Sequence, residues 1–190
     1  MKFQQMKSEI WFVVLLFMAT SVHAQKEYIL KSHKVSIDGT SSLHDWSSEV
    51  TKIEWAGQLT VDGTSVKAIR NVTLSIPVES IKSEKGGIMD DKTYEAFNSE
   101  KNPNITFKLT SATVTGGTIK ANGNLTMAGV TKPIVIHAEV KVLANGSVRI
   151  SGMQKLNMKD YKMTPPKAMM GTIKVGEKVN LLFELTLTPQ

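Results

Sequence analysis

The stretch NGNLTMAGVTKPIVIHAEV, from Asn122 to Val140, reads as a strand, a tight turn and a second strand. In its second half apolar side chains recur at every other position, and a period of two is typical of a strand with one buried face. That face carries Ile134, Ile136, Ala138, Val140 and Val142. A filled core, another chain or an apolar ligand can each lie against such a face, and the rest of the sequence bears on which of them does.

The same alternation recurs along most of the chain. The further apolar sets are Ile53, Trp55, Gly57, Leu59 and Val61; Val72, Leu74, Ile76 and Val78; Ile105, Phe107 and Leu109; Val148 and Ile150; and Val179, Leu181, Phe183, Leu185 and Leu187. Turn signals such as Asp62-Gly63 and Gly116-Gly117 separate these sets. Many short strands joined by tight hairpins indicate an antiparallel barrel or sandwich.

One segment, Ile88–Pro103, breaks the alternation. Its sequence, IMDDKTYEAFNSEKNP, contains good helix formers after a candidate N-cap at Asp90 or Asp91. Tyr94 and Phe97 lie three residues apart, which places them on one side of a helix. We therefore expect a short helix between strands, ended by the closing proline, with its aromatic side packed across the barrel.

The N-terminus has the pattern of a secretory signal. Lys2 and Lys7 precede an apolar run over residues 10–19, and Ser21-Val22-His23-Ala24 resembles a signal-peptidase site. The apolar run is shorter than the ~20 residues that a helix needs to cross a bilayer. We expect a cleaved signal peptide over residues 1–24, a single mature domain over residues 25–190, and export to a bacterial periplasm.

The sequence contains no cysteine, so an exported domain of this kind relies on burial and backbone pairing instead of disulfides. Closing the sheet into a barrel removes its exposed edges, which favours a barrel over a sandwich. A barrel of about eight strands is just wide enough to be filled by side chains or to hold a small ligand. The small inward residues Gly57 and Ala138 indicate a partly open interior, although Leu and Ile side chains can also fill it.

The net charge of +6 comes from scattered basic residues and not from a run interleaved with aromatics. We expect no nucleic-acid partner. Weak contact with an anionic membrane surface fits the charge, and the sequence leaves a monomer and a homodimer equally open.

Residues for catalysis are scarce. The only His-Asp neighbourhood is His44-Asp45, and adjacent residues on a strand point to opposite faces. The other histidines of the mature chain, His33 and His137, lack the short spacing of dedicated zinc sites. We expect a protein that is not an enzyme and has no metal or cofactor. Metal-assisted hydrolysis through these histidines is the minority hypothesis, and it predicts bound zinc.

The segment MKDYKMTPPKAMMG, Met158–Gly171, is rich in methionine and broken by two prolines. Methionine suits surfaces that accept varied apolar shapes. The segment is interpreted equally well as a lid over a barrel mouth or as a plug that fills the barrel end.

Four stretches carry a resemblance to the YceI-like family. GNLTMAGVTKPIVI (123–136) looks like that family's G-x-L-T-x-x-G-V-T-K-P hairpin, and EAFNSEKNPNITFKLTSATV (95–114) resembles its helix-to-strand segment. VGEKVNLLFELTL (175–187) resembles its closing strand, and SSLHDW (41–46) is similar to the start of some members. The resemblance implies an all-β, extended antiparallel barrel of lipocalin-like shape in the periplasm, and some members carry a long isoprenoid-type lipid.

Under this resemblance the inward side chains line a tunnel for the lipid. The implied lining residues are Ile53, Trp55, Leu59, Leu74, Ile76, Phe107, Leu109, Ile134, Ile136, Ala138, Leu181 and Phe183. The leading hypothesis is a non-catalytic carrier of a polyisoprenoid or an isoprenoid quinone. Its candidate mouth residues are His44, Trp46, Tyr161 and Met163. The alternative is a filled barrel without lipid that acts as an envelope stress or interaction protein through its loops or basic surface.

Overall fold

The computed structural model describes residues 25–168 and 171–190, so the predicted signal peptide lies outside the described residues. The elements are β1 (Lys26–Ser41), β2 (Trp46–Val50), β3 (Glu54–Asp62), β4 (Ser65–Pro77), η1 (Val78–Ser80), β5 (Ile81–Ser83), α1 (Gly87–Phe97), β6 (Asn104–Thr115), β7 (Thr118–Met127), β8 (Val130–Val142), β9 (Val148–Asn157), η2 (Met158–Tyr161), β10 (Lys167–Ala168) and β11 (Ile173–Pro189). The η elements are 3₁₀ turns.

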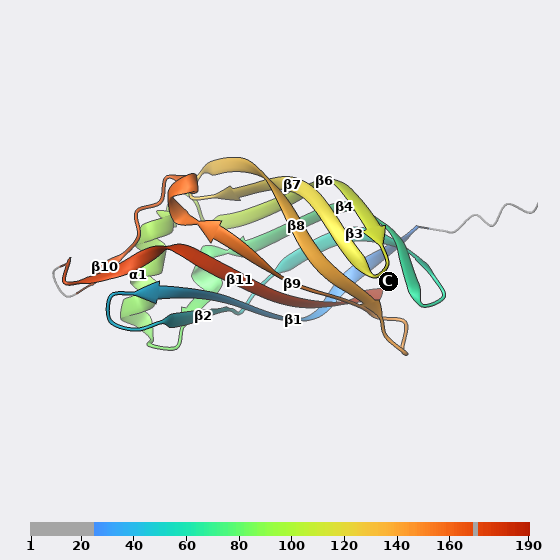
Figure 1. Ribbon diagram of the computed structural model, residues 1–190, viewed down its shortest axis with the longest axis horizontal. Coiled ribbons are helices and arrows are strands. Elements are labelled where there is room, and N and C mark those ends of the chain that lie inside the picture. Colours follow the sequence, from blue (N-terminus) through green and yellow to red (C-terminus); the bar gives the residue numbers. More distant parts are fainter. Residues whose placement is uncertain (1–24, 169–170) are drawn as a thin grey trace, which may run out of the picture.

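Eight antiparallel strands close into a barrel in the order β1, β11, β9, β8, β7, β6, β4, β3 (Figure 1). The closure is the long pairing of β1 with β11, from Tyr28 opposite Pro189 to Ser41 opposite Val175. The short strands β2, β5 and β10 add to the sheet at one end. The expected all-β antiparallel barrel of about eight strands with one short helix is confirmed, and the sandwich alternative is excluded.

The strand that opened the sequence analysis, β8, alternates as expected. Ala138 and Val140 are buried, Ile134 and Ile136 are partly buried, and the intervening side chains from Val135 onward are exposed. β8 pairs with β7 from Val130 to Glu139, across a tight turn at Ala128-Gly129. The apolar face of β8 therefore points into the barrel.

Strict alternation fails on β4, because two β-bulges interrupt its pairing with β3. Val66, Ile69 and Val72 are all buried although they lie three residues apart. Asn71, with φ of 54°, lies in the second bulge. Each bulge adds one residue to β4, so the inward-facing positions change parity at each bulge. They are even-numbered at Val66, odd-numbered at Ile69 and even-numbered again at Val72.

The predicted helix is present as α1, but its predicted N-cap is wrong. Gly86 is the N-cap, with φ of 82°, a conformation that a residue without Cβ adopts readily. Asp90 lies inside the first turn, where its carboxylate accepts a hydrogen bond from the Ser83 backbone N–H at 2.7 Å, while Asp91 is exposed. The helix ends before the proline, at a left-handed Asn98. No described helix is both long and apolar enough to span a membrane.

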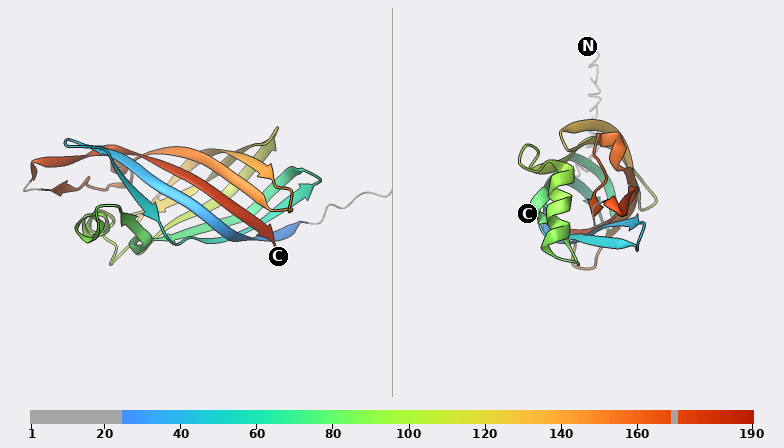
Figure 2. Two further views of the ribbon diagram at one scale, coloured as in Figure 1. Left: turned by 90° about the horizontal axis from the view of Figure 1, so that it is seen from below. Right: turned by 90° about the vertical axis from the view of Figure 1, so that its left-hand side faces the viewer.

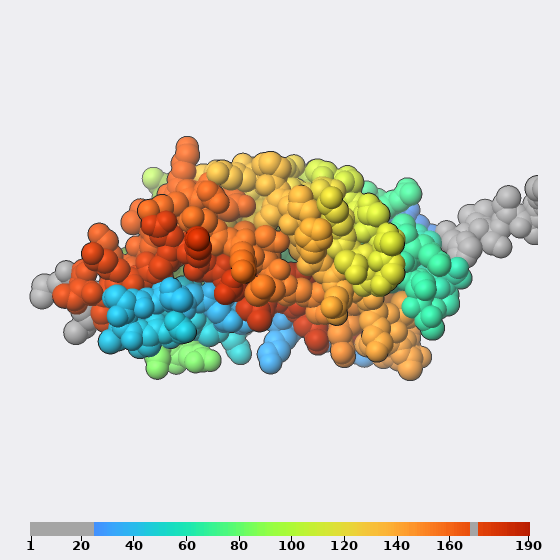
Figure 3. All heavy atoms as spheres, viewed as in Figure 1, coloured from blue at the N-terminus to red at the C-terminus, as the bar shows by residue number. Residues whose placement is uncertain are grey.

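The two ends of the elongated barrel are built differently (Figure 3). One end carries the β3–β4, β6–β7 and β8–β9 turns and the C-terminus (Figure 1). The other end carries the β1–β2 hairpin, α1 and the segment that follows β9. Viewed onto this second end, α1 lies across one side and the η2–β10 segment lies on the other (Figure 2, right).

The end with the C-terminus is packed by what we name the closed-end cluster. Its buried members are Tyr28, Leu59, Val66, Ile69, Val72, Ile119, Ala138, Val140, Val148, Ile150 and Leu187. Leu59, Val148 and Leu187 have no exposed surface at all. Side chains therefore fill much of the barrel at this end. Five of them, Ile69, Val72, Ile119, Ala138 and Ile150, form the inner end of a cavity that extends toward α1.

Candidate ligand cavity

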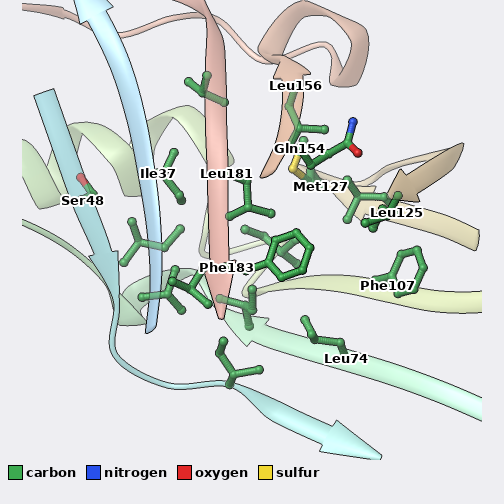
Figure 4. A pocket seen from close by; sticks show the side chains of 18 of the residues that line it. Ile37, Ser48, Leu74, Phe107, Leu125, Met127, Gln154, Leu156, Leu181 and Phe183 are labelled. Carbon is green, nitrogen blue, oxygen red and sulfur yellow. The ribbon is translucent and has the colours of Figure 1, made fainter. Parts of the chain in front are cut away.

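The barrel interior holds a cavity of about 340 Å³. All eight barrel strands contribute inward side chains to it, together with α1 and the segment after β9. Most of these side chains are aliphatic or aromatic, as Leu74, Phe107, Leu125, Leu181 and Phe183 illustrate in Figure 4. Ligand pockets of proteins are typically concave, mostly apolar and of this order of size or larger.

The cavity is long in relation to its width. On β11 its lining side chains run from Val175 to Leu185. A strand rise of about 3.3 Å per residue and a tilt of about 40° convert this stretch to a depth of roughly 25 Å. Because the closed-end cluster seals the far end, the cavity is a blind tunnel that reaches toward the α1 end.

Eleven of the twelve sequence-predicted tunnel residues line this cavity. These are Ile53, Trp55, Leu74, Ile76, Phe107, Leu109, Ile134, Ile136, Ala138, Leu181 and Phe183. Leu59 does not line it, because its side chain lies wholly within the closed-end cluster. The positions of these side chains are those of a cavity wall, and their contact with a ligand stays a prediction.

Trp55 has a second role in the wall. Its indole N–H donates to the backbone oxygen of Tyr28 at 3.1 Å. β1 pairs with β3 only at Lys26 and Glu27, and with β2 only from Ser36 onward. The Trp55 side chain therefore links β1 and β3 next to a stretch in which backbone pairing is missing.

Glycines beneath aromatic rings keep the wall thin. A Cβ on Gly152 would lie 2.7 Å from Cζ of Phe183, its cross-strand partner, which is too close for two carbon atoms. A Cβ on Gly123 would likewise lie too close to the ring of Phe107, although the cross-strand partner of Gly123 is Leu109. Each ring covers a backbone segment without a side chain, so it takes up less of the lumen than a ring stacked on a Cβ would.

Three of the four predicted mouth residues, His44, Trp46 and Met163, line the cavity. Tyr161 does not: it is buried in the main core cluster, 4% exposed. Burial, and after it the negative charge of Asp160, raises the pKa of the Tyr161 phenol, which therefore stays neutral at physiological pH. Tyr161 is placed as a packing residue and not as a mouth residue.

The segment that the sequence interpreted as either a lid or a plug forms part of the wall. β8 and β9 pair only between Ala138–Val142 and Val148–Gly152, and η2 contacts both strands beyond that point. Met158 and Met163 are buried, and with Pro166 they line the cavity. Met169 and Met170 lie outside the described residues.

Among the side chains that line the cavity at the α1 end are several polar ones, and we name this polar set the mouth. It consists of His44, Ser83, Lys85, Lys92 and Thr93. These residues come from the β1–β2 hairpin, from β5 and its following loop, and from α1. Polar groups thus border the end of the tunnel that lies opposite the closed-end cluster.

Two polar lining residues lie deeper than the mouth and were missed in the sequence. Ser48 on β2 is 3% exposed, and Gln154 on β9 is half-buried. Gln154 follows Ile150 in the inward alternation of β9, so the period-two pattern held the signal that could have identified it. Ser48 lies in a strand of only five residues, too short for the pattern to be visible.

Two of the candidate catalytic histidines, His44 and His33, contact backbone oxygens. His44 Nδ1 lies 2.8 Å from the backbone oxygen of Asp45, not from its carboxylate. His33 Nε2 lies 3.2 Å from the backbone oxygen of Val50. Within residues 25–168 and 171–190 no three His, Asp or Glu side chains gather in a way that could hold a metal ion.

Comparison with known proteins matches the family model described as the YceI-like domain to residues 5–187. No curated protein matches the chain. Among solved structures, BcnA of Burkholderia cenocepacia is 18% identical, with a TM-score of 0.67, and the match covers 82% of this chain and 96% of BcnA.

Two further solved structures share the fold. A polyisoprenoid-binding domain from Saccharophagus degradans, described as implicated in plant cell wall breakdown, is 11% identical, with a TM-score of 0.62 and coverage of 88% of this chain and 100% of that domain. The YceI protein of Campylobacter jejuni is 21% identical, with a TM-score of 0.55 and coverage of 74% and 85%.

Proposed function

This chain belongs to the YceI-like family, and on that premise we propose that it is an exported, non-catalytic carrier that holds a long apolar lipid, a polyisoprenoid or an isoprenoid quinone, in its barrel. The observation that carries the proposal is the blind tunnel, lined by apolar side chains from all eight barrel strands. The structural neighbour from Saccharophagus degradans, described as a polyisoprenoid-binding domain, supports the same class of ligand.

The tunnel suits a chain longer than a membrane acyl chain. A bilayer core is about 30 Å thick, so one leaflet spans about 15 Å. The tunnel depth of roughly 25 Å exceeds this. Burying an apolar chain stabilises the complex by roughly 0.8 kcal/mol per CH₂ group, so the affinity comes mainly from desolvation.

The proposed location is the periplasm, supported by the signal-like residues 1–24 and the absence of cysteine from the sequence. We include weak contact of the mouth with an anionic membrane surface. Lys85 and Lys92 border the mouth, and the elements at the same end expose Leu43 and Ile88, with 65% and 79% of their surface accessible. Such a combination favours transfer of a lipid between a bilayer and the tunnel.

A substitution in the wall tests the proposal. Ala138 lines the tunnel, whereas the neighbouring His137 points outward and is exposed. We expect Ala138→Trp to abolish retention of lipid, because the indole occupies the lumen, and His137→Trp to retain it. Lipid extracted from the purified variants is quantified by mass spectrometry, and far-UV circular dichroism checks that both variants fold.

If the Ala138→Trp variant folds and carries as much lipid as the His137→Trp variant, the ligand does not lie in the tunnel. The alternative, a filled barrel that acts on envelope partners through its loops, would then take precedence.

A further inference from the structure

Ser48 and Gln154 lie at one level of the tunnel. Ser48 on β2 pairs with Ile37 on β1, Ile37 pairs with Leu181 on β11, and Leu181 pairs with Gln154 on β9. Figure 4 shows this row from Ser48 on the left to Gln154 on the right. On β11, Leu181 lies between the innermost lining residue, Leu185, and the outermost, Val175, so the row crosses the tunnel well inside the mouth.

The Ser48 hydroxyl has no hydrogen-bond partner among the described residues. Ser48 is 97% buried yet lines the cavity, and none of the described residues has a side-chain nitrogen or oxygen that is both sealed from access and unpaired. The accessible side of the hydroxyl is therefore the side that faces the lumen. Leaving a hydroxyl in an apolar wall without a partner costs free energy, and a hydrogen bond to a ligand would offset this cost.

Gln154 offers an acceptor to the same lumen. Its Nε2 donates to the backbone oxygen of Lys155 at 3.0 Å. A carbonyl oxygen can only accept, so the amide nitrogen has to face it, and this fixes the orientation of the side chain. The amide oxygen Oε1 is then the atom left without a partner in the described chain. An amide oxygen accepts and does not donate, so it selects for a ligand group that carries a proton.

From the unpaired amide oxygen we infer that the tunnel holds an apolar chain that bears a hydroxyl group, and that Gln154 is the residue that selects it. The inference deepens the proposed carrier function and rests on it. The ligand hydroxyl donates to Gln154 Oε1. Ser48 lies three strands away along the row, about 14 Å at ~4.8 Å per strand, so its hydroxyl meets another part of the lumen and not the same ligand oxygen. A phosphate is disfavoured at this depth, because no charged side chain other than those of the mouth lines the described tunnel wall.

Two probes with the same chain test the inference: geranylgeraniol and its methyl ether, which keeps the oxygen but cannot donate. We expect the wild-type protein to bind the alcohol about tenfold more tightly than the ether, as one neutral hydrogen bond in an apolar site predicts. Gln154→Met, a replacement of similar length without the acceptor, should reduce this ratio to about one. Ser48→Ala should leave the ratio at its wild-type value, because Ser48 lies too far from Gln154 to contact the same oxygen.

Lys155→Met is the matched control, because it places a methionine at the next residue of β9, where the side chain is exposed. It should leave the ratio at the wild-type value. Thermal unfolding without lipid gives a second readout. Ser48→Ala should not lower the melting temperature, because it removes an unpaired polar group from an apolar wall. Gln154→Met should lower it little, because the hydrogen bond that it removes, to the Lys155 backbone oxygen, is exposed.

Equal binding of the alcohol and the ether to the wild type would overturn the inference and leave the carrier function standing. A preference for the alcohol that survives in Gln154→Met would do the same. If the wild type binds neither probe, the carrier function itself fails and the inference falls with it.

Discussion

At the scale of single residues, the width of the tunnel depends on glycines, which have no side chain. Gly152 on β9 leaves the space that the Phe183 ring occupies, and Gly123 on β7 does the same for Phe107. A methyl group at Gly152 would also come within 2.9 Å of the His137 backbone oxygen. At both glycines the constraint is geometric, because any side chain would push a ring into the lumen.

Gly152→Ala should therefore destabilise the fold by about 1–3 kcal/mol, the usual cost of overpacking, and reduce the amount of lipid bound. Urea unfolding and lipid extraction measure the two effects. Gly87→Ala is the control, because a Cβ there meets open space, and it should change neither quantity.

The double variant Gly152→Ala/Phe183→Leu should recover part of the lost stability, since the smaller side chain relieves the contact with the ring. A Gly152→Ala variant as stable as the wild type would show that the ring and the glycine do not constrain each other.

The residues of the site could be predicted from the sequence to the extent that they obey alternation. Ile134, Ile136 and Ala138 follow it and line the tunnel. Ile69 also lines the tunnel but was missed, because the bulges on β4 shift the inward face and no residue pattern marks them in advance. Tyr161 was predicted as a mouth residue but is buried, in a turn that contacts β8 and β9, and such burial is a tertiary effect that the local sequence does not carry.

At the scale of elements, α1 borders the mouth and is held at its first turn. Asp90 accepts the Ser83 backbone N–H at 2.7 Å, and Lys82 Nζ lies 3.6 Å from the same carboxylate. Further along the helix, the Tyr94 hydroxyl donates to the backbone oxygen of Glu79 at 3.0 Å. The helix is thus tied to the β5 region by side chains, and its position sets the shape of the mouth.

Asp90→Ala should destabilise the protein by about 2 kcal/mol, because it removes a hydrogen bond to a charged acceptor and leaves a backbone N–H unpaired. It should also speed the release of bound lipid, because α1 is then held less firmly beside the mouth. Unfolding in urea and the transfer of lipid to vesicles measure the two quantities.

Asp91→Ala provides the comparison, since Asp91 is exposed on the same helix and carries the same charge. Its effect on both quantities should be small. Equal effects of the two substitutions would mean that the net charge of α1 matters and the contact with Ser83 does not.

The sequence located α1 correctly but misplaced its start. Asp90 and Asp91 have the composition of an N-cap, yet Gly86 begins the helix because its positive φ turns the chain out of β5. Asp90 instead reaches back to Ser83, a contact that depends on how β5 and α1 meet in space. Helix composition was readable in the sequence, whereas the geometry of the connection was not.

At the scale of the whole molecule, the barrel is closed without a disulfide by the long pairing of its first and last strands. One end is filled by the closed-end cluster, and the other half encloses the tunnel. The strand pattern in the sequence was sufficient to predict the barrel. It was not sufficient to predict the division into a filled and an open half, because that division depends on which side chains meet across the lumen.

The central claim is that the tunnel carries a lipid, and native mass spectrometry of the mature protein purified from the periplasm tests it most directly. The account predicts a mass above that of residues 25–190 by one apolar molecule, which organic extraction then identifies as an isoprenoid-type lipid bearing a hydroxyl group. A mass equal to that of the bare chain, unchanged after incubation with isoprenoid alcohols and quinones, would contradict the account.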